Sequence, residues 1–371
     1  MAQRPSAVEM LGMKPFSNIY HGKCVLVTGH TGFKGSWLTL WLTELGARVV
    51  GLALDPETNP SHWELLELSI DDRRADIRDA VAMTRLIAET QPEIVFHLAA
   101  QPLVRRSYCE PLTTWATNVM GTANLLEACR HTPSVRAIVV VTTDKCYENR
   151  EWPWGYRETD RLGGHDPYSA SKAGAELVAA SYRASFFSTD ARILLATARA
   201  GNVIGGGDWS KDRLIPDLVR ALSSGEPLEI RLPHATRPWQ HVLESLSGYL
   251  LLGQRLLSGD ATCAEAWNFG PEPEGNRTVA EVLGKLTGHW PALRWQITEN
   301  PQLHEATLLY LDSSKARSRL KWQPVWNFDT ALAKTVEWYR TWMETGQIIS
   351  GAQLAEYIAT AIERGLPWAQ A

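Results

Sequence analysis

The sequence has no long apolar run and no excess of charge of either sign. Among its 371 residues, no hydrophobic stretch approaches the roughly 20 residues that a membrane-spanning helix needs, so we expect no membrane partner. The formal net charge is −4, from 37 basic and 41 acidic residues, which argues against nucleic acid as a partner. The first 23 residues lack the apolar core of a signal peptide. We expect them to form a short arm before the first strand of a cytoplasmic protein.

Cysteine is scarce, and neither cysteine nor histidine is spaced for metal binding. The five cysteines are odd in number and contain no C-x-x-C pair, a pattern typical of reduced thiols rather than of a disulfide framework. The ten histidines form no H-E-x-x-H or similar ligand spacing, so we predict no metal site. What remains is an ordinary globular composition, 44% hydrophobic and 21% charged, in a chain long enough for two domains.

The first two hundred residues alternate short apolar runs with helical patterns. Near-continuous apolar strands separated by helices are typical of a parallel sheet covered on both faces. The predicted fold class is therefore α/β, with a Rossmann-type doubly wound parallel sheet. The predicted strands lie within residues 24–29, 48–55, 73–79, 93–100, 136–144 and 192–202, and the helices that separate them include 81–89, 115–130 and 168–186.

From residue 201 the composition changes. Pro, Gly and Trp become frequent and the hydrophobic spacing less regular, which we interpret as a smaller α/β substrate lobe beyond the carboxyl edge of the sheet. Residues 238–270 again have the pattern of a helix and a strand, and we expect them to return to the first lobe. The predicted domains are therefore discontinuous: 1–200 with 238–270 for the cofactor, and 201–237 with 271–371 for the substrate.

The segment VTGHTGFKG places three glycines, Gly29, Gly32 and Gly35, between the first strand and the first helix. Glycines there let the backbone turn tightly and approach a pyrophosphate at the helix N-terminus. The spacing is looser than the dinucleotide fingerprint, but its position predicts a nucleotide cofactor. Asp55, 20 residues after Gly35, would accept ribose hydroxyls and repel a 2′-phosphate, which favours NAD over NADP. Lys34 either joins this site or is a solvated helix charge.

Two further clusters carry reactive side chains. Residues 142–145, TTDK, end an apolar strand with two hydroxyls, a carboxylate and an ammonium; read alone, they are typical of a turn. Tyr168 and Lys172 of YSASK are four residues apart, so they share one helix face. A neighbouring ammonium favours the phenolate of a tyrosine and lowers its pKa toward neutrality. Chance placement of the pair is the alternative.

Together with Asp76 in ADIRD, HLAAQ at residues 97–101 and Asn118, these motifs resemble the extended short-chain dehydrogenase/reductases that act on nucleotide sugars. The resemblance runs from about residue 23 to 326. Within that family, GHTGFKGSW, TDKCY, EWPWGYRE, AGNVIGGGDW, RPWQHV and WNFGP are most similar to the CDP-glucose 4,6-dehydratases. The resemblance implies a lyase that converts CDP-D-glucose to CDP-4-dehydro-6-deoxy-D-glucose and water with bound NAD.

The resemblance also implies roles for five residues. Tyr168 would take the proton of the sugar 4-hydroxyl, Lys172 would lower its pKa and hold the nicotinamide ribose, and Thr143 would bond the same hydroxyl. Hydride passes from C4 to NAD, water leaves across C5 and C6, and hydride returns to C6. Asp144 would be the general acid for C6–O cleavage, a group that an epimerase does not need. Lys145 would either remove the C5 proton or stabilise the enolate.

Further contacts follow from the same resemblance. Asn202 and Arg237 match positions that contact the diphosphate, although Arg237 in a surface ion pair is an alternative, and Arg213 is a weaker candidate. The implied cofactor contacts are Gly29, Thr31, Gly32, Phe33, Lys34, Gly35, Asp55, Asp76, Ile77, Leu98, Ala99, Ala100, Asn118, Thr142, Tyr168 and Lys172. The implied substrate contacts are Gln101, Asn202, Arg213 and Arg237.

The family resemblance implies an assembly as well. Helices over 115–130 and 168–186 would form a two-fold four-helix interface, which gives a homodimer, with a homotetramer as the alternative. Two other functions compete with the dehydratase: a nucleotide-sugar 4-epimerase and a non-catalytic NAD(H)-binding regulator. The regulator needs the Gly-rich turn but not the catalytic groups, so their presence argues against it.

Overall fold

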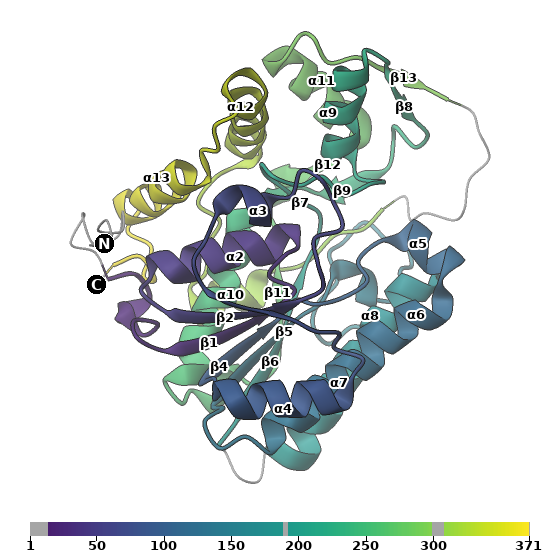
Figure 1. Cartoon of the computed structure of the whole chain (residues 1–371). Coiled ribbons are helices and arrows are strands. Elements are labelled where there is room, and N and C mark those ends of the chain that lie inside the picture. Colours follow the sequence, from purple (N-terminus) through teal and green to yellow (C-terminus); the bar gives the residue numbers. More distant parts are fainter. Residues whose placement is uncertain (1–13, 188–191, 299–307, 371) are drawn as a thin grey trace.

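The computed structural model describes residues 14–187, 192–298 and 308–370. Its centre is a seven-stranded sheet in the order β11-β6-β5-β4-β1-β2-β3, with every neighbouring pair parallel (Figure 1). This order confirms the predicted doubly wound fold. The strands are β1 Cys24–Thr28, β2 Arg48–Ala53, β3 Asp71–Arg74, β4 Ile94–His97, β5 Ala137–Val141, β6 Leu194–Ala200 and β11 Ala266–Phe269.

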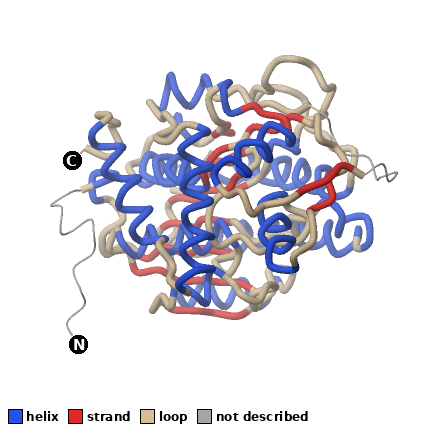
Figure 2. Tube along the Cα trace, turned by 90° about the horizontal axis from the view of Figure 1, so that it is seen from above, coloured by secondary structure: helices blue, strands red, loops and turns tan. Residues whose placement is uncertain are grey.

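Helices cover both faces of this sheet (Figure 2). Successive strand residues point to opposite faces, so Val25 and Val27 of β1 pack into one apolar core with Trp37, while Leu26 packs into a second core with Leu125. The first core includes α2 Phe33–Glu44 and α10 Val242–Leu257. The second includes α4 Ala80–Thr90, α7 Gly121–Arg130 and α8 Pro167–Tyr182.

The strand predicted over 73–79 is wrong at its end, because β3 stops at Arg74. Asp79 instead caps α4: its carboxylate accepts hydrogen bonds from the amides of Val81 and Ala82 at 3.0 Å each. A capping residue of this kind marks the start of a helix and not the end of a strand. The helix predicted over 115–130 starts earlier. It is built from α6 Pro111–Trp115, the π-turn η2 Ala116–Met120 and α7, and α8 likewise continues into the π-turn η4 Arg183–Phe187.

The helix and strand expected within residues 238–270 are α10 and β11. Strand β11 pairs in parallel with β6 and becomes the edge of the main sheet. Helix α10 lies against β5 and β6. The chain therefore returns from the second lobe to the first, while the domain boundaries themselves stay a prediction.

The second lobe lies beyond the carboxyl ends of the strands, at the top of Figure 1. It contains two small strand pairs, β8 with β13 and β9 with β12, and a third pair, β7 with β10, lies between the lobes. The strands of these three pairs are β7 Val203–Ile204, β8 Leu228–Ile230, β9 Thr236–Pro238, β10 Gln240–His241, β12 Asn276–Thr278 and β13 Trp295–Ile297. The remaining helices are α3 His62–Leu66, α5 Val104–Cys109, α9 Leu214–Ser224, α11 Val279–His289, α12 Phe328–Thr345 and α13 Ser350–Glu363. The short turns are η1 Pro15–Asn18, η3 Asp144–Cys146, η5 Ala261–Cys263, η6 Pro273–Gly275 and η7 Ala316–Leu320.

A buried carboxylate connects the C-terminal segment to α10. Glu244 accepts the amides of Val325 and Trp326 at 2.8 Å each and the hydroxyl of Tyr357 at 2.7 Å. Burial raises the pKa of Glu244 to about 7, and the three donors oppose that rise. These bonds hold α13 and the loop before α12 against α10 of the first lobe.

Candidate active site

A cavity of about 1590 Å³ opens at the carboxyl ends of the central strands, between the sheet and the second lobe. Open α/β sheets bind their ligands at this edge. The volume exceeds the roughly 300–1,000 Å³ of a pocket for one small ligand, so it suits a dinucleotide and a nucleotide sugar together. Every residue predicted to act in catalysis or binding lines this cavity except Asn118.

The Gly-rich turn has the geometry of an anion cradle. Gly29 has φ +76°, and a Cβ there would lie 2.7 Å from the amide nitrogen of Ala99; a Cβ on Gly35 would lie 2.0 Å from the Gly29 carbonyl oxygen. Both positions therefore require glycine. Gly32 is the N-cap of α2, and no side chain caps that helix. The exposed N-terminus of α2 fits a pyrophosphate.

Two carboxylates lie farther out along the same edge. Asp55 follows β2 and keeps its side chain 91% exposed, with the Arg74 guanidinium 3.6 Å away. Asp76 accepts hydrogen bonds from Arg78, which hold the pKa of that carboxyl below its usual range. Both line the cavity, and Asp55 stands where a ribose hydroxyl acceptor is expected.

Lys34 is not a solvated helix charge, so that alternative is wrong. Its side chain is half-buried in the cavity wall, and Nζ donates to the hydroxyl of Tyr249 on α10 at 3.3 Å. Burial lowers the pKa of Lys34 to about 7; the Arg213 cation adds to this effect, while Asp144 opposes it. Lys34 therefore faces the groups predicted to do the chemistry.

The TTDK segment forms a turn and also presents a buried acid. Thr143 accepts the amide of Lys145 at 3.3 Å and donates its hydroxyl to Asp144 Oδ1 at 2.9 Å. Asp144 Oδ2 is buried with no hydrogen-bond partner in the described part of the chain. Burial raises the pKa of Asp144, against the attraction of Lys145 and Arg237. A raised pKa favours the protonated form that a general acid requires.

The cap of α8 places Tyr168 beside this acid. Asp166 accepts the Ser169 amide at 2.9 Å and the Ser169 hydroxyl at 2.6 Å, and Pro167 occupies the first helical turn, where its missing N–H costs nothing. Tyr168 follows immediately and makes a hydrogen bond with Thr143. The end of β5 and the start of α8 thus bring the predicted base and acid together.

The pKa of Tyr168 differs from the sequence-based expectation. Burial raises it, and the hydrogen bond with Thr143 only partly offsets the rise. Lys172 Nζ donates to the Val141 carbonyl at 3.1 Å, and its charge does not overcome the effect of burial on Tyr168. Burial also lowers the pKa of Lys172 to about 8. Tyr168 and Lys172 alone therefore do not produce the lowered Tyr168 pKa that the sequence predicted.

Two predicted cofactor residues are engaged by the protein itself. Asn118 is buried outside the cavity: its Oδ1 accepts the Gln101 amide at 2.8 Å, and its Nδ2 donates to the Gln101 carbonyl at 3.1 Å and to Ser171 Oγ at 2.8 Å. Asn118 therefore supports Gln101 and α8, and its contact with the cofactor stays a prediction. Thr142 lines the cavity, but its hydroxyl donates to Glu176.

The predicted substrate residues of the second lobe gather on its side of the cavity. Arg213 forms an ion pair with Asp208 at 2.9 Å. Arg237 is buried on β9 and donates to the Thr236 carbonyl at 3.0 Å, so a surface ion pair is the wrong interpretation of it. Asn202 lies between β6 and β7. Their contacts with substrate stay a prediction.

Comparison with known proteins agrees with this geometry. The family described as GDP-mannose 4,6 dehydratase matches residues 26–335. The chain belongs to this family. It is 49% identical over 351 residues to the CDP-glucose 4,6-dehydratase of Salmonella typhimurium, an alignment that covers 92% of this chain and 98% of that protein. The expected nucleotide-sugar branch of the short-chain dehydrogenase/reductases is thereby confirmed.

Solved structures with this 4,6-dehydratase fold include enzymes of two reaction types. The dTDP-glucose 4,6-dehydratase DesIV from Streptomyces venezuelae, determined with NAD bound, is 28% identical, with a TM-score of 0.72 over 85% of this chain and 97% of that one. The epimerase Mth375 from Methanothermobacter thermautotrophicus is 26% identical, with a TM-score of 0.78 over 90% of this chain and 96% of that one. The bound NAD agrees with the predicted cofactor, whereas the fold alone does not separate dehydratase from epimerase.

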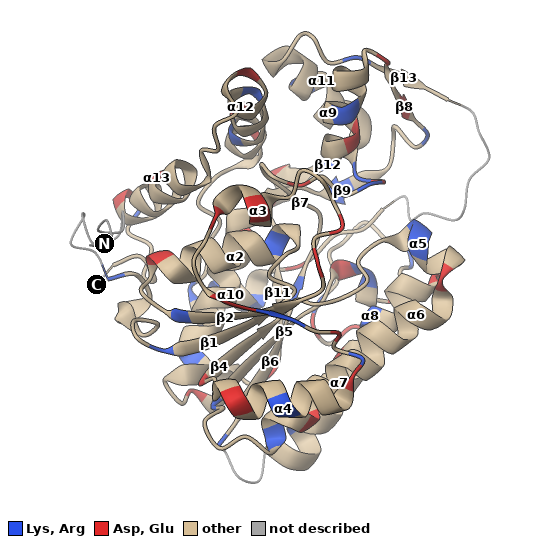
Figure 3. Cartoon of the chain, in the orientation of Figure 1, with Lys and Arg blue, Asp and Glu red and all other residues tan. Residues whose placement is uncertain are grey.

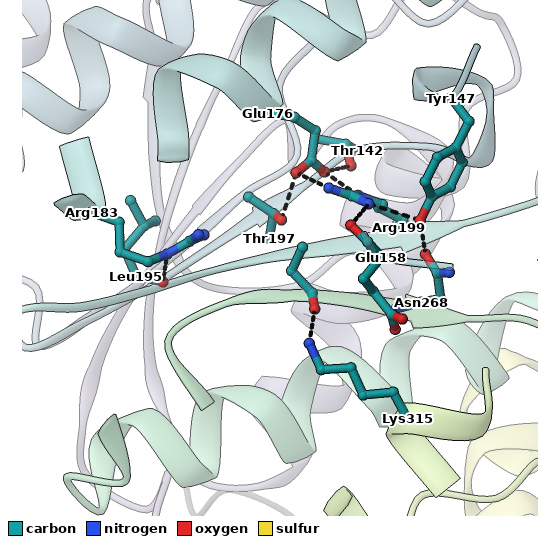
Figure 4. Close-up of polar contacts among 11 residues, drawn as sticks. Thr142, Tyr147, Glu158, Glu176, Arg183, Leu195, Thr197, Arg199, Asn268 and Lys315 are labelled. Atoms are coloured by element: carbon teal, nitrogen blue, oxygen red, sulfur yellow. Dashed lines mark hydrogen bonds and ion pairs between the residues drawn. The ribbon is translucent and has the colours of Figure 1, made fainter. Parts of the chain in front are cut away.

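A buried polar network behind the site of this dehydratase family member escaped sequence reasoning (Figure 4). Glu176 of α8 accepts the hydroxyls of Thr142 and Thr197 and two N–H groups of Arg199, and Arg199 Nη1 donates to the Tyr147 hydroxyl at 2.8 Å. The spacing in the sequence does indicate Glu176, because it is eight residues after Tyr168 and lies on the same face of α8. An acidic side chain on the covered face of a helix indicates a buried partner.

Charged side chains also join the two lobes at the mouth of the cavity. Arg105 of α5, a helix that carries blue positions at the rim in Figure 3, pairs with Asp212 of the second lobe at 3.3 Å. Arg106 pairs within the first lobe, with Glu57 in the loop after β2, at 2.8 Å. Among the described residues, no helix is long and apolar enough to cross a bilayer. The same residues contain no group of three or more His, Cys, Asp or Glu side chains that could hold a metal ion.

Proposed function

We propose that this chain converts CDP-D-glucose to CDP-4-dehydro-6-deoxy-D-glucose and water. The observation that carries the proposal is the placement of Asp144: a buried carboxyl whose pKa is raised by burial, bonded to Thr143, which in turn contacts Tyr168. An acid beside the predicted base is what elimination of water requires and epimerisation does not. The 49% identity with a CDP-glucose 4,6-dehydratase supports the same substrate.

The cofactor that fits the site is NAD. The uncapped N-terminus of α2 at Gly32 would hold the pyrophosphate, and the exposed carboxylate of Asp55 would hold the adenosine ribose. When bound there, NAD would supply the hydride acceptor for C4 and, once reduced, the hydride donor for C6. Lys172, at the inner end of the cavity, would bind the nicotinamide ribose.

The side chains divide the proton transfers between them. Tyr168 accepts the proton of the 4-hydroxyl, which Thr143 helps to orient. Asp144 then donates a proton to the departing C6 hydroxyl, a poor leaving group without it. Lys145 removes the C5 proton or stabilises the enolate; both roles stay open. Arg237 supplies a guanidinium for the diphosphate, a geometry suited to bidentate binding.

The test is incubation with CDP-glucose and no added reductant. Formation of a 4-ketosugar, detected by its alkali-induced absorbance, is the expected result, since the redox change is internal. UDP-glucose, which differs only in the base, and dTDP-glucose, which differs in the base and lacks the ribose 2′-hydroxyl, serve as comparison substrates. Conversion of CDP-glucose to CDP-galactose would establish an epimerase instead. Tight NAD binding with no sugar product would indicate the regulator.

We propose a cytoplasmic homodimer, with a tetramer as the alternative. Exposed apolar residues on α6, η2 and α8 of the first lobe support the dimer. Leu112 of α6, Met120 of η2 and Leu177 of α8 are 82%, 56% and 60% exposed, and α6 and α8 lie in contact. Burying these side chains against a second copy would remove apolar surface from water. The expected interface pairs these helices with the same helices of a second copy.

A further inference from the structure

We propose that Glu176 is a positioning residue for the reaction, holding the Lys172 ammonium and the end of β5 in their working arrangement. The proposal rests on the proposed function. It concerns a side chain that lies behind the cavity and lines no part of it. Glu176 therefore acts through its neighbours and not on the sugar.

The geometry places Glu176 between the elements that carry the chemistry. Tyr168, Lys172 and Glu176 follow one another at intervals of four on α8, so all three lie on one face. The Glu176 carboxylate reaches back to Thr142 at the end of β5, next to Thr143. One buried anion thus joins the helix with the base to the strand with the acid (Figure 4).

The carboxylate is fully engaged on its other side by β6. Thr197 donates to Oε2 at 2.8 Å, and Arg199 donates through Nε to Oε1 at 2.9 Å and through Nη2 to Oε2 at 2.8 Å. Both members of the ion pair are 3% exposed. Burial alone would raise the pKa of Glu176, but the Arg199 cation and the hydroxyl donors hold it below its usual range. Glu176 is therefore an anion in a dry environment.

That anion acts on Lys172, one helical turn away. Burial lowers the pKa of Lys172 to about 8, and Glu176 is the largest influence that opposes this lowering. Without the negative charge, Lys172 would lose its proton at lower pH and could no longer favour the phenolate of Tyr168. The other titratable or charged groups that face Lys172 are Tyr168 from α8, Cys146 from η3, His97 from β4, Lys34 from α2 and, behind Glu176, Arg199 from β6.

The experiment compares Glu176→Gln, which keeps the shape and loses the charge, with Glu176→Asp, which keeps the charge. Thr197→Val is the matched control, because it removes one donor to the same carboxylate and leaves both charges. The first readout needs no substrate: the pKa of Lys172 is followed by NMR of protein with ¹³Cε-labelled lysine and assigned with Lys172→Met. The second is the pH profile of cofactor reduction in a single turnover with CDP-glucose.

In Glu176→Gln we expect the Lys172 pKa to fall by roughly one to three units, the usual effect of one close charge. The alkaline limb of the reduction rate should move to lower pH by the same amount, about tenfold in rate per unit. Glu176→Asp should restore most of the wild-type profile, and Thr197→Val should leave it unchanged.

A double variant separates loss of the Glu176 charge from misfolding. The Glu176→Gln change alone would leave Arg199 buried without its counter-charge, which destabilises strongly, whereas replacing both partners by neutral groups is often tolerated. The Glu176→Gln/Arg199→Met protein should show the same direction of shift. If folded variants titrate like wild type and lose only thermal stability, the positioning role is overturned. If the Lys172 shift appears but wild-type protein makes no ketosugar, the proposed function fails and only the electrostatic effect of Glu176 on Lys172 stands.

Discussion

The ammonium of Lys34 donates a hydrogen bond to the hydroxyl of Tyr249 at 3.3 Å, across 215 residues of sequence. The contact joins the first turn of α2 to the middle of α10 beneath the cavity. It brings a lysine with a pKa of about 7 next to the site of Asp144 and Lys172. Because burial disfavours the charged form of Lys34, this lysine affects the stability of the fold as well as the chemistry of the site.

We expect Lys34→Met to stabilise the protein in a pH-dependent way. The pKa of Lys34 is lower in the folded chain than in the unfolded one, so below about pH 7 both states hold the proton and the folded state bears the whole cost of burial. As the pH rises above 7, the folded state releases the proton first and the cost falls. Thermal unfolding should therefore show the largest gain at about pH 6 and a smaller one at about pH 10. Lys285→Met on α11, which removes a lysine charge from a partly exposed ion pair with Asp329, is the control and should not show a larger gain at about pH 6 than at about pH 10.

Asp144→Asn should separate the two halves of the reaction. Asparagine keeps the shape but donates no acid proton, so elimination should slow by the ~10²–10⁴ typical of a general acid. Oxidation at C4 should survive, and reduced cofactor should accumulate in a single turnover with CDP-glucose. Product formation at the wild-type rate would mean that Asp144 only caps the turn after β5.

Tyr168→Phe should abolish the first hydride transfer and leave the fold intact. The change deletes one oxygen from the face of α8 and removes the base for the 4-hydroxyl, so the cofactor should stay oxidised when CDP-glucose is added. Absorbance of reduced nicotinamide at wild-type speed would contradict the assignment. Binding of NAD, measured by calorimetry, serves as the control.

Lys172→Met should give a milder defect than the loss of the tyrosine hydroxyl. Because Lys172 has a pKa of about 8, the wild-type rate of cofactor reduction should fall as the pH rises through 8 and the ammonium is lost. The variant has no such proton to lose, so its slower rate should lack this descending limb and rise with pH as Tyr168 ionises. A descending limb retained near pH 8 would assign it to another group.

Leu112→Glu combined with Leu177→Glu should dissociate the proposed homodimer. Both side chains are exposed on the face formed by α6 and α8, and charges there would oppose burial against a second copy. Sedimentation velocity measures the change. Val81→Glu on α4, 79% exposed but away from this face, is the matched control; dissociation by that variant too would argue against the assigned interface.

Local patterns were sufficient for most of the sheet, for the Gly-rich turn and for YSASK, whereas most of the other residues around the cavity were named from the family resemblance. The apolar runs that became β1, β4, β5 and β6 are recognisable because a strand buried on both faces needs apolar side chains at nearly every position. The Gly-rich turn and YSASK are short motifs whose geometry is set within one turn of backbone. The carboxyl ends of parallel strands must meet at one edge, so these motifs converge on one cavity.

The amino-acid order was therefore enough for the fold class, the cofactor cradle and the reactive side chains of the Gly-rich turn, TTDK and YSASK, because each depends on neighbours a few residues apart. The environment of those groups follows from the packing of distant segments. Lys34 is half-buried beside Tyr249 instead of being a surface charge, and Asn118 bonds Gln101. The pKa of Tyr168 rose because burial outweighs a lysine that bonds Val141, and Glu176 found Arg199 on another strand. Burial and partner choice arise from segments far apart in the chain, and no local pattern encodes them.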